Sequence, residues 1–353
     1  MPDDLLESTK QPIAESLASD PEVLRQVKRL LRTGAVRDTL ESAGGNYSGD
    51  VLESIFGDDG FGGDELDVVS GDDSSQYFDG QLPSNRDQLE AIVEVTGRPP
   101  LLVRNDNWDN PVIDEIKNRL DEHRTKVQPC LQSIGRIDIV DGDDASNPTQ
   151  IGSGWMIDDD IMITNAHVAD EFASANPNGK EFTLTTINNE VVLADWKREH
   201  ENSDSKVVRI EKVLWMAEKD GGNYKPHDMA FLRVARMDTE LPPPLLLEDH
   251  EAEFNQHVAT IGYPAKDPFN DTFVMLKYFD NVYNVKRLSP GQLKGVGDET
   301  RIEHDCTTLG GSSGSPVINL ETGKVLGLHF AGSYKRRNLA VKISFVKERL
   351  SKL

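Results

Sequence analysis

The sequence predicts a mostly β protein in which a barrel-type region follows a short helical segment. Three observations lead to this prediction. From about residue 134 onward, short apolar strands alternate with turn residues, a pattern typical of barrels rather than of βαβ folds. An amphipathic helix pattern lies near the N-terminus, and a tract rich in Asp and Gly separates the two regions.

The length, net charge and cysteine count of the chain limit the class of protein. A chain of 353 residues is long for one domain, so we expect a domain of about 200 residues plus an additional module. The formal net charge of −23 disfavours nucleic acid as a partner, because phosphate binding needs clustered basic residues. Only Cys130 and Cys306 are present, which is too few for a disulfide scaffold and fits a reducing compartment.

The sequence shows neither a membrane-spanning pattern nor a secretion signal. No apolar run approaches the roughly 20 residues that a membrane-spanning helix needs, and 37% of the residues are hydrophobic. The first residues, Met1 to Glu7, lack the basic and apolar parts of a secretion signal. We therefore expect a cytoplasmic protein that does not bind a membrane.

The N-terminal part is predicted to be a small helical module over residues 1–56. Asp20 and Pro21 form a good helix start, and Gly34 ends the apolar pattern that follows. Residues 57–85 then carry eight acidic residues, six glycines and no Lys or Arg, which is typical of a solvated linker. A calcium loop is the alternative, but EF-hand ligand spacing is absent, so we predict no metal and no cofactor.

Residues 86–128 are predicted to form a connector that packs on the following domain. Its first part, Arg86 to Val95, fits a helix or a strand equally well, and Leu101 to Val103 is strand-like. Asn110-Pro111 is expected to open a helix whose apolar face carries Val112, Ile113, Ile116 and Leu120.

The domain itself is predicted to span residues 129–353. We expect a final helix from Phe345, and strands at 134–140, 150–157, 161–164, 182–186, 191–196, 207–215, 231–234, 258–263, 273–278, 282–288, 317–319 and 325–330.

The segment Gly310-Gly311-Ser312-Ser313-Gly314-Ser315-Pro316 places a serine among small residues, where the backbone can turn sharply and expose a hydroxyl. The N–H groups of Gly311 and Ser313 could then face one pocket and hold an oxyanion. Taken alone, the segment fits a Gly/Ser-rich turn between two strands equally well.

A nucleophilic serine needs a base, and the base needs an orienting group. His167 follows the apolar strand Ile161 to Thr164, and Asp228 precedes the apolar run Met229 to Val234. Each signal is weak alone, since such residues commonly serve packing or end a loop. All three in the order His, Asp, Ser, each at a strand edge, indicate a catalytic triad.

These three segments resemble the signature segments of trypsin-like (chymotrypsin-fold) serine proteases, and are more similar to the bacterial, disulfide-free branch of that family. The resemblance covers roughly residues 130–350. It implies two six-stranded β-barrels with a C-terminal helix and a catalytic cleft between the barrels. It further implies Ser313 as nucleophile, His167 as general base, Asp228 as orienting carboxylate, and the amides of Gly311 and Ser313 as oxyanion hole.

The resemblance also bears on Asp228 and on specificity. Phe330 stands where relatives carry a serine that helps to hold the aspartate, so we expect Asp228 to take its donors from backbone near Ala166 and His167. Thr308 and His329 stand where bacterial glutamyl endopeptidases place a Thr and a His that bind an acidic side chain. Hydrogen-bond donors suit a carboxylate that loses its hydration.

An acidic P1 residue is therefore one interpretation, and a small or apolar P1 residue, with His329 only packed in the core, is the other. The predicted activity is that of a serine endopeptidase acting on proteins or peptides. Self-cleavage within the acidic linker, residues 57–85, is a further hypothesis. The alternative class is a catalytically inactive peptide-binding module of the same fold.

Overall fold

The fold is that of a computed structural model. The structure describes residues 98–142, 148–176, 181–186, 189–220, 223–236, 240–266, 272–296, 300–333 and 337–353. Contacts divide the chain into two units, Met1–Gln88 and Leu89–Leu353, and only the second contains described residues. The predicted N-terminal module (1–56), the acidic linker (57–85) and the first part of the connector lie outside the described residues.

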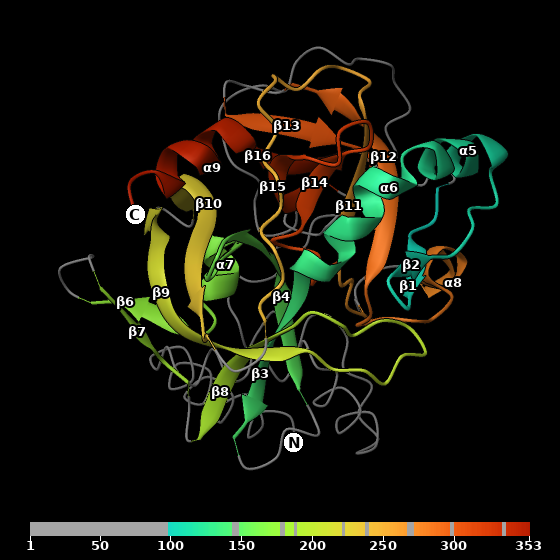
Figure 1. Cartoon of the computed structure of the whole chain (residues 1–353). Coiled ribbons are helices and arrows are strands. Elements are labelled where there is room, and N and C mark those ends of the chain that lie inside the picture. Colours follow the sequence, from blue (N-terminus) through green and yellow to red (C-terminus); the bar gives the residue numbers. More distant parts are fainter. Residues whose placement is uncertain are drawn as a thin grey trace, which may run out of the picture. The chain divides into compact units, whose positions relative to one another are not determined.

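Six antiparallel strands form a closed barrel in the order β10-β5-β4-β3-β8-β9 (Figure 1). Their bounds are β3 Ile134–Asp141, β4 Thr149–Asp158, β5 Ile161–Thr164, β8 Glu190–Asp195, β9 Val207–Asp220 and β10 Asn223–Val234. Apolar side chains such as Ile137, Met162 and Leu232 fill its interior. Two short strands, β6 (Ala173–Ala175) and β7 (Phe182–Leu184), pair separately.

A second ring of six strands follows the order β11-β14-β15-β16-β13-β12 and is closed by pairing of β11 with β12. Their bounds are β11 His257–Gly262, β12 Arg287–Gly295, β13 Arg301–His304, β14 Pro316–Asn319, β15 Val325–Ser333 and β16 Arg337–Lys342. The C-terminal helix α9, Ile343–Leu350, follows β16 directly. The mostly β fold with two six-stranded barrels and a C-terminal helix is thus confirmed.

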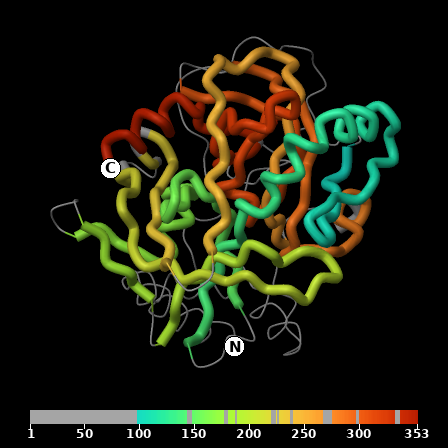
Figure 2. The backbone as a smooth tube through the Cα atoms, in the orientation of Figure 1, coloured from blue at the N-terminus to red at the C-terminus, as the bar shows by residue number. Residues whose placement is uncertain are grey.

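The described part of the connector runs beside the second ring of strands (Figure 2). It contains β1 Leu101–Arg104, β2 Asn107–Trp108, α5 Asp114–Glu122 and α6 Arg124–Val127, and the 3₁₀ helix η3 Gln128–Ser133 then leads from it into β3. Leu101 in β1 pairs with Leu288 in β12, which adds β1 and β2 to the sheet. Val103 and Leu120 are buried in the same apolar cluster as Ile261 and Leu328, so the connector shares a core with the barrels.

Buried polar groups also hold the two barrels and the segment between the connector and β3 together. The ammonium group of Lys286, which is fully buried, donates to the carbonyls of Leu131 and Trp196 at 2.6 Å each. The phenol of Tyr263 donates to the carbonyl of Ile134 at 3.0 Å. Because a buried donor must find an acceptor, these bonds fix the segment before β3 against the second ring.

The predicted strand at 273–278 is wrong, because Thr272–Phe279 forms the helix α8. Met275, Tyr278 and Phe279 are buried together with Leu309, a spacing that matches one face of a helix. The predicted strand at 282–288 is also misplaced, since β12 begins only at Arg287. Asn284 has φ of +62°, a left-handed conformation that interrupts an extended strand.

The predicted helix after Asn110-Pro111 begins later than expected, at Asp114. Val112 is 90% exposed and Ile113 is 37% exposed, whereas Leu120 is buried, so the expected apolar face is only partly right. The sequence patterns do not predict strands β2, β6, β13 and β16. Within the described residues, no helix is both long and apolar enough to span a membrane.

Candidate active site

His167 lies in a single helical turn that directly follows a strand of the first barrel. Strand β5 ends at Thr164, Asn165 is extended with ψ of 154°, and α7 covers Ala166–Ala169. The buried side chains of Ala166 and Val168 anchor this turn in the barrel core. The imidazole of His167 is therefore held at the barrel surface, where its side chain stays 34% exposed.

Asp228 reaches the same place from β10. The β9–β10 ladder is irregular between Lys225 and Ala230, and this bulge turns Asp228 out of the regular pairing. Nδ1 of His167 lies 2.7 Å from Oδ2 of Asp228, and the amide of His167 donates to Oδ1 at 3.1 Å. The side-chain amide of Asn165 donates to the carbonyl of Asp228 at 2.9 Å. The expectation that Asp228 takes a donor from the backbone of His167 is confirmed.

Ser313 lies in the turn that leads into β14. The amide of Ser315 donates to the carbonyl of Ser312 at 2.9 Å, and the amide of Gly314 donates to the carbonyl of His329 at 2.9 Å. Gly314 has φ of +88°, and a Cβ there would lie only 2.5 Å from Oγ1 of Thr164. Glycine is thus required at 314 both for its conformation and for the close approach to β5.

The peptide groups before Ser313 have fixed directions. The carbonyl of Gly310 accepts from the amide of Ala265 at 2.6 Å. In a trans peptide the C=O and N–H point in opposite directions, so the N–H of Gly311 points away from Ala265. The carbonyl of Ser312 accepts from Ser315, so by the same rule the N–H of Ser313 points away from that amide.

The segments that carry His167 and Ser313 meet at Gly152 in β4. A Cβ built on Gly152 would lie 2.7 Å from Cγ1 of Val168, the neighbour of His167, and 3.3 Å from the carbonyl oxygen of Ser313. The next residue, Ser153, donates its amide to that same carbonyl at 2.9 Å. Folding therefore brings the three predicted triad segments, far apart in sequence, to one region of the surface.

The comparison with known families agrees with this arrangement. A model of the trypsin-like peptidase domain matches residues 152–328, half of the chain, and the match includes His167, Asp228 and Ser313. The chain belongs to the trypsin-like peptidase family. Together with the names of its relatives, the family match identifies the protein as a serine peptidase.

Curated relatives of this peptidase come from bacteria. A probable serine protease of Lysobacter enzymogenes is 27% identical over 292 residues, covering 74% of this chain and 73% of the relative. A glutamyl endopeptidase of Staphylococcus epidermidis is 26% identical over 204 residues, covering 56% of this chain. The alignment spans 60% of the length of that glutamyl endopeptidase.

The solved structures that align with this chain are less similar to it in sequence than these relatives. A serine endoprotease from Yersinia pestis aligns with a TM-score of 0.42 and 13% identity, covering 65% of each chain. The structure of Deg5 aligns with a TM-score of 0.43 and 18% identity, covering 67% of this chain and 94% of the other.

The two predicted specificity residues of the peptidase lie in its interior. Thr308 is 2% exposed, and its hydroxyl makes no hydrogen bond within the described residues. His329 is fully buried in β15, and its Nδ1 lies 3.2 Å from Nε2 of His304, which is also fully buried. Burial, followed by the neighbouring His329 ring, holds the pKa of His304 well below its usual value, so His304 is neutral.

Sequence reasoning missed three residues near the peptidase site: Ser153, His304 and Arg98. The only local signal for Ser153 is its position between two glycines in Gly152-Ser153-Gly154. Arg98, in the connector, forms an ion pair with Asp305, three residues before Thr308. Neither His304 nor Arg98 shows a sequence pattern that points to the site.

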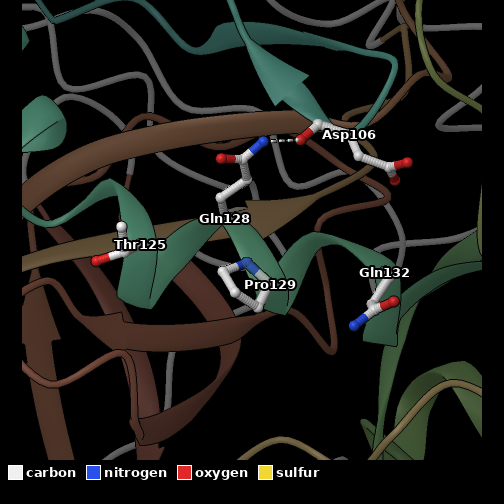
Figure 3. Close-up of a pocket in the computed structure, with 5 residues that line it drawn as sticks. All are labelled: Asp106, Thr125, Gln128, Pro129 and Gln132. Carbon is white, nitrogen blue, oxygen red and sulfur yellow. Dashed lines mark hydrogen bonds between the residues drawn. The ribbon is translucent and has the colours of Figure 1, made fainter.

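A separate hollow of about 370 Å³ lies between the connector and η3 and is shown in Figure 3. Asp106, Thr125, Gln128, Pro129 and Gln132 line it, and the side-chain amide of Gln128 donates to the carbonyl of Asp106 at 2.9 Å. None of the predicted site residues lines this hollow. Among the described residues, no group of three His, Cys, Asp or Glu side chains is arranged to hold a metal ion.

Proposed function

We propose that the peptidase is an active serine endopeptidase with Ser313, His167 and Asp228 as its catalytic triad. The observation that carries this proposal is the contact of 2.7 Å between Nδ1 of His167 and Oδ2 of Asp228. This contact is supported by the approach of the Ser313 backbone and Val168 to Gly152. A carboxylate on Nδ1 selects the tautomer in which Nδ1 carries the proton and Nε2 acts as the acceptor, and a nucleophilic serine requires such a base.

The geometry suggests the following sequence of steps. Nε2 of His167 takes the proton of Ser313 while Oγ attacks the substrate carbonyl, and Asp228 stabilises the resulting imidazolium. The N–H groups of Gly311 and Ser313 hold the oxyanion of the tetrahedral intermediate. His167 then donates its proton to the leaving amine as the peptide C–N bond breaks. In the second half of the reaction, His167 takes a proton from water, the water oxygen attacks the acyl-enzyme, and His167 returns the proton to Oγ of Ser313.

Labelling with a fluorophosphonate probe tests the proposal. We expect the folded wild type to be labelled at one site and Ser313→Ala not to be labelled, because the probe reacts only with an activated serine. Absence of labelling of folded wild-type protein would instead support the inactive peptide-binding module.

For the substrate class, we propose a preference for an acidic P1 residue, with Thr308 and His329 as its binding groups. Support comes from the glutamyl endopeptidases among the relatives and from the buried Thr308 hydroxyl, which has no hydrogen-bond partner within the described residues. Cleavage of a peptide library would show Glu or Asp before the cut bond. Cleavage after small or apolar residues alone would contradict this preference.

We further propose that the acidic linker, residues 57–85, is a substrate of the protein's own site, because it offers Asp and Glu side chains. Intact-mass spectra after prolonged incubation should show shortened wild-type chains and full-length Ser313→Ala. Identical masses for the two proteins would contradict self-cleavage. Cytoplasmic localisation stays a prediction from the sequence.

A further inference from the structure

Ser153 occupies the centre of β4, the strand of the first barrel that faces the Ser313 turn, and is fully buried. It makes two hydrogen bonds to this turn. Its amide donates to the carbonyl of Ser313 at 2.9 Å, and its hydroxyl donates to the carbonyl of Gly311 at 2.7 Å. One residue of the first barrel thus holds the turn that carries the nucleophile at two points, through its backbone at Ser313 and through its side chain at Gly311.

The direction of the hydroxyl proton is fixed by a neighbour. Oγ of Ser153 accepts a hydrogen bond from the amide of Tyr263 at 3.1 Å. Because a serine hydroxyl has a single proton, and the Tyr263 amide occupies one of its lone pairs, the proton is available for the carbonyl of Gly311. The hydroxyl of Ser153 therefore acts as donor and acceptor at once. Neither alanine nor glycine has a side-chain group that could do this.

Two glycines flank Ser153 and keep the backbone of β4 close to its neighbours on either side. Gly152 precedes Ser153, and a Cβ at Gly152 would clash with Val168 and crowd the carbonyl of Ser313. Gly154 follows it, and a Cβ there would lie 2.7 Å from the carbonyl of Ile163, so this glycine fits β4 against β5 within the barrel. Gly152 thus lets β4 approach the turn at backbone distance, and Ser153 supplies the one short polar side chain that reaches it.

The peptide held by this hydroxyl lies between the two N–H groups assigned to the oxyanion. Gly311 has φ of +92°, a conformation from which a glycine can rotate its peptide planes at low cost. Apart from the bond from Ser153, the Gly311–Ser312 peptide is held by the bond from the Ser312 amide to the carbonyl of Leu309, at 2.9 Å. Loss of the hydroxyl would leave the carbonyl of Gly311 without this donor, so that the peptide can turn and move the oxyanion donors apart.

We propose that Ser153 is a positioning residue for the oxyanion hole: its hydroxyl locks the Gly311–Ser312 peptide so that the N–H groups of Gly311 and Ser313 stay directed at one point. This inference rests on the proposed function, because it assigns a role within that site. Ser153 touches neither substrate nor the reacting atoms in this role.

The test compares Ser153→Ala with wild type in two measurements. The kcat on a peptide substrate should fall about 10- to 100-fold, approaching the loss of one oxyanion donor, while KM changes little. The inhibition constant of a peptide aldehyde, whose adduct carries an oxyanion-like oxygen, should rise by a similar factor. A purely structural role would lower the melting temperature without this selective loss for the tetrahedral adduct.

Ser205→Ala is the control. The hydroxyl of Ser205 donates to Oδ2 of Asp195 at 3.4 Å, between β8 and β9 and outside the Ser313 turn, so its removal should leave both measurements within about twofold of wild type. If Ser153→Ala does not fold, Ser153→Cys retains a weak donor of similar shape and should show an intermediate loss.

The measurements distinguish failure of the inference about Ser153 from failure of the proposed function. An active wild type together with an unchanged Ser153→Ala overturns the inference and leaves the proposed function intact. A folded wild type that neither reacts with fluorophosphonate nor cleaves any peptide overturns the proposed function, and the inference with it.

Discussion

Arg98 is ion-paired with Asp305, with 2.5 Å between Nη2 and Oδ2, and the two side chains are only 13% and 3% exposed. Arg98 belongs to the connector, outside the matched peptidase region, whereas Asp305 lies in the loop that continues to Thr308 and Ser313. The hydroxyl of Thr307 also donates to the carbonyl of Arg98, at 3.3 Å. The connector is therefore part of the support of this loop.

Arg98→Ala should lower the free energy of unfolding by about 1–3 kcal/mol, because a largely buried carboxylate loses a partner. Asp305 keeps Lys294 at 3.1 Å and the amide of Gln292 at 2.7 Å, so the protein should still fold. Urea unfolding measures the change. Arg104→Ala, which removes a more exposed ion pair of the connector with Glu201, should cost less than about 1 kcal/mol.

Asp228→Asn should reduce kcat about 10³- to 10⁴-fold with a small change in KM, because the amide no longer selects the tautomer of His167. Hydrolysis of a peptide substrate measures the loss. Asp170→Asn is the control. Asp170 immediately follows the His167 turn but accepts from the hydroxyl of Tyr224 at 3.1 Å, so activity should persist. Equal activity of both variants would remove Asp228 from the proposed triad.

Replacement of His304 should affect the P1 preference more than the turnover of other substrates. Nε2 of His304 faces Nδ1 of His329, and a neutral His304 that donates there leaves Nε2 of His329 as the protonated nitrogen. His304→Leu should lower kcat/KM for an acidic P1 residue about 3- to 10-fold, the effect of one lost hydrogen bond. His304→Gln, which keeps a donor near the position of Nε2, should recover part of the loss. A uniform fall for all P1 residues would count against this role.

The burial of Lys286 predicts a specific pH dependence of the free energy of unfolding. Burial lowers the pKa of Lys286 to about 8, below its ordinary value of 10.5. Between these two values the unfolded state binds the proton that the folded state has released, so stability rises with pH by up to about 3 kcal/mol. Below pH 8 both states are charged, and this contribution is constant.

Urea unfolding of Ser313→Ala between pH 7 and 10, with and without Lys286→Met, measures the effect without self-digestion. Burial raises the pKa of Cys130 to about 11 and that of Cys306 to about 12, so these thiols lose their stabilising contribution above pH 9 in both proteins. The difference between the two proteins therefore isolates Lys286. Parallel pH profiles would show that the Lys286 ammonium is not destabilised by burial.

Much of the site could be predicted because its signals are local. His167 follows the strand Ile161–Thr164, Asp228 lies next to an apolar run, and Ser313 is surrounded by small residues. Each signal lies within one short stretch of the chain, and the backbone conformation of such a stretch depends mainly on its own residues. The contact between His167 and Asp228 agrees with the predicted pairing of these residues.

The errors in the fold arise where local patterns are ambiguous. The apolar residues of α8 are compatible with a strand until packing against Leu309 selects the helical face. Strand β16 carries polar and basic residues beside its buried Ala340 and Val341, so its alternation is weak in the sequence. Its place in the sheet is fixed by pairing with β13 and β15, which only the folded chain provides.

The amino-acid sequence alone determined which chemical groups are present, their order along the chain, and the glycines that permit left-handed or crowded backbone near Ser313. Only the tertiary structure decided that Ser153 holds the carbonyl of Gly311, 158 positions away, and that Arg98 pairs with Asp305. The physical reason is the short range of hydrogen bonds and close ion pairs. They act over about 3 Å, so their partners are selected by how the strands pack, and no spacing in the sequence encodes them.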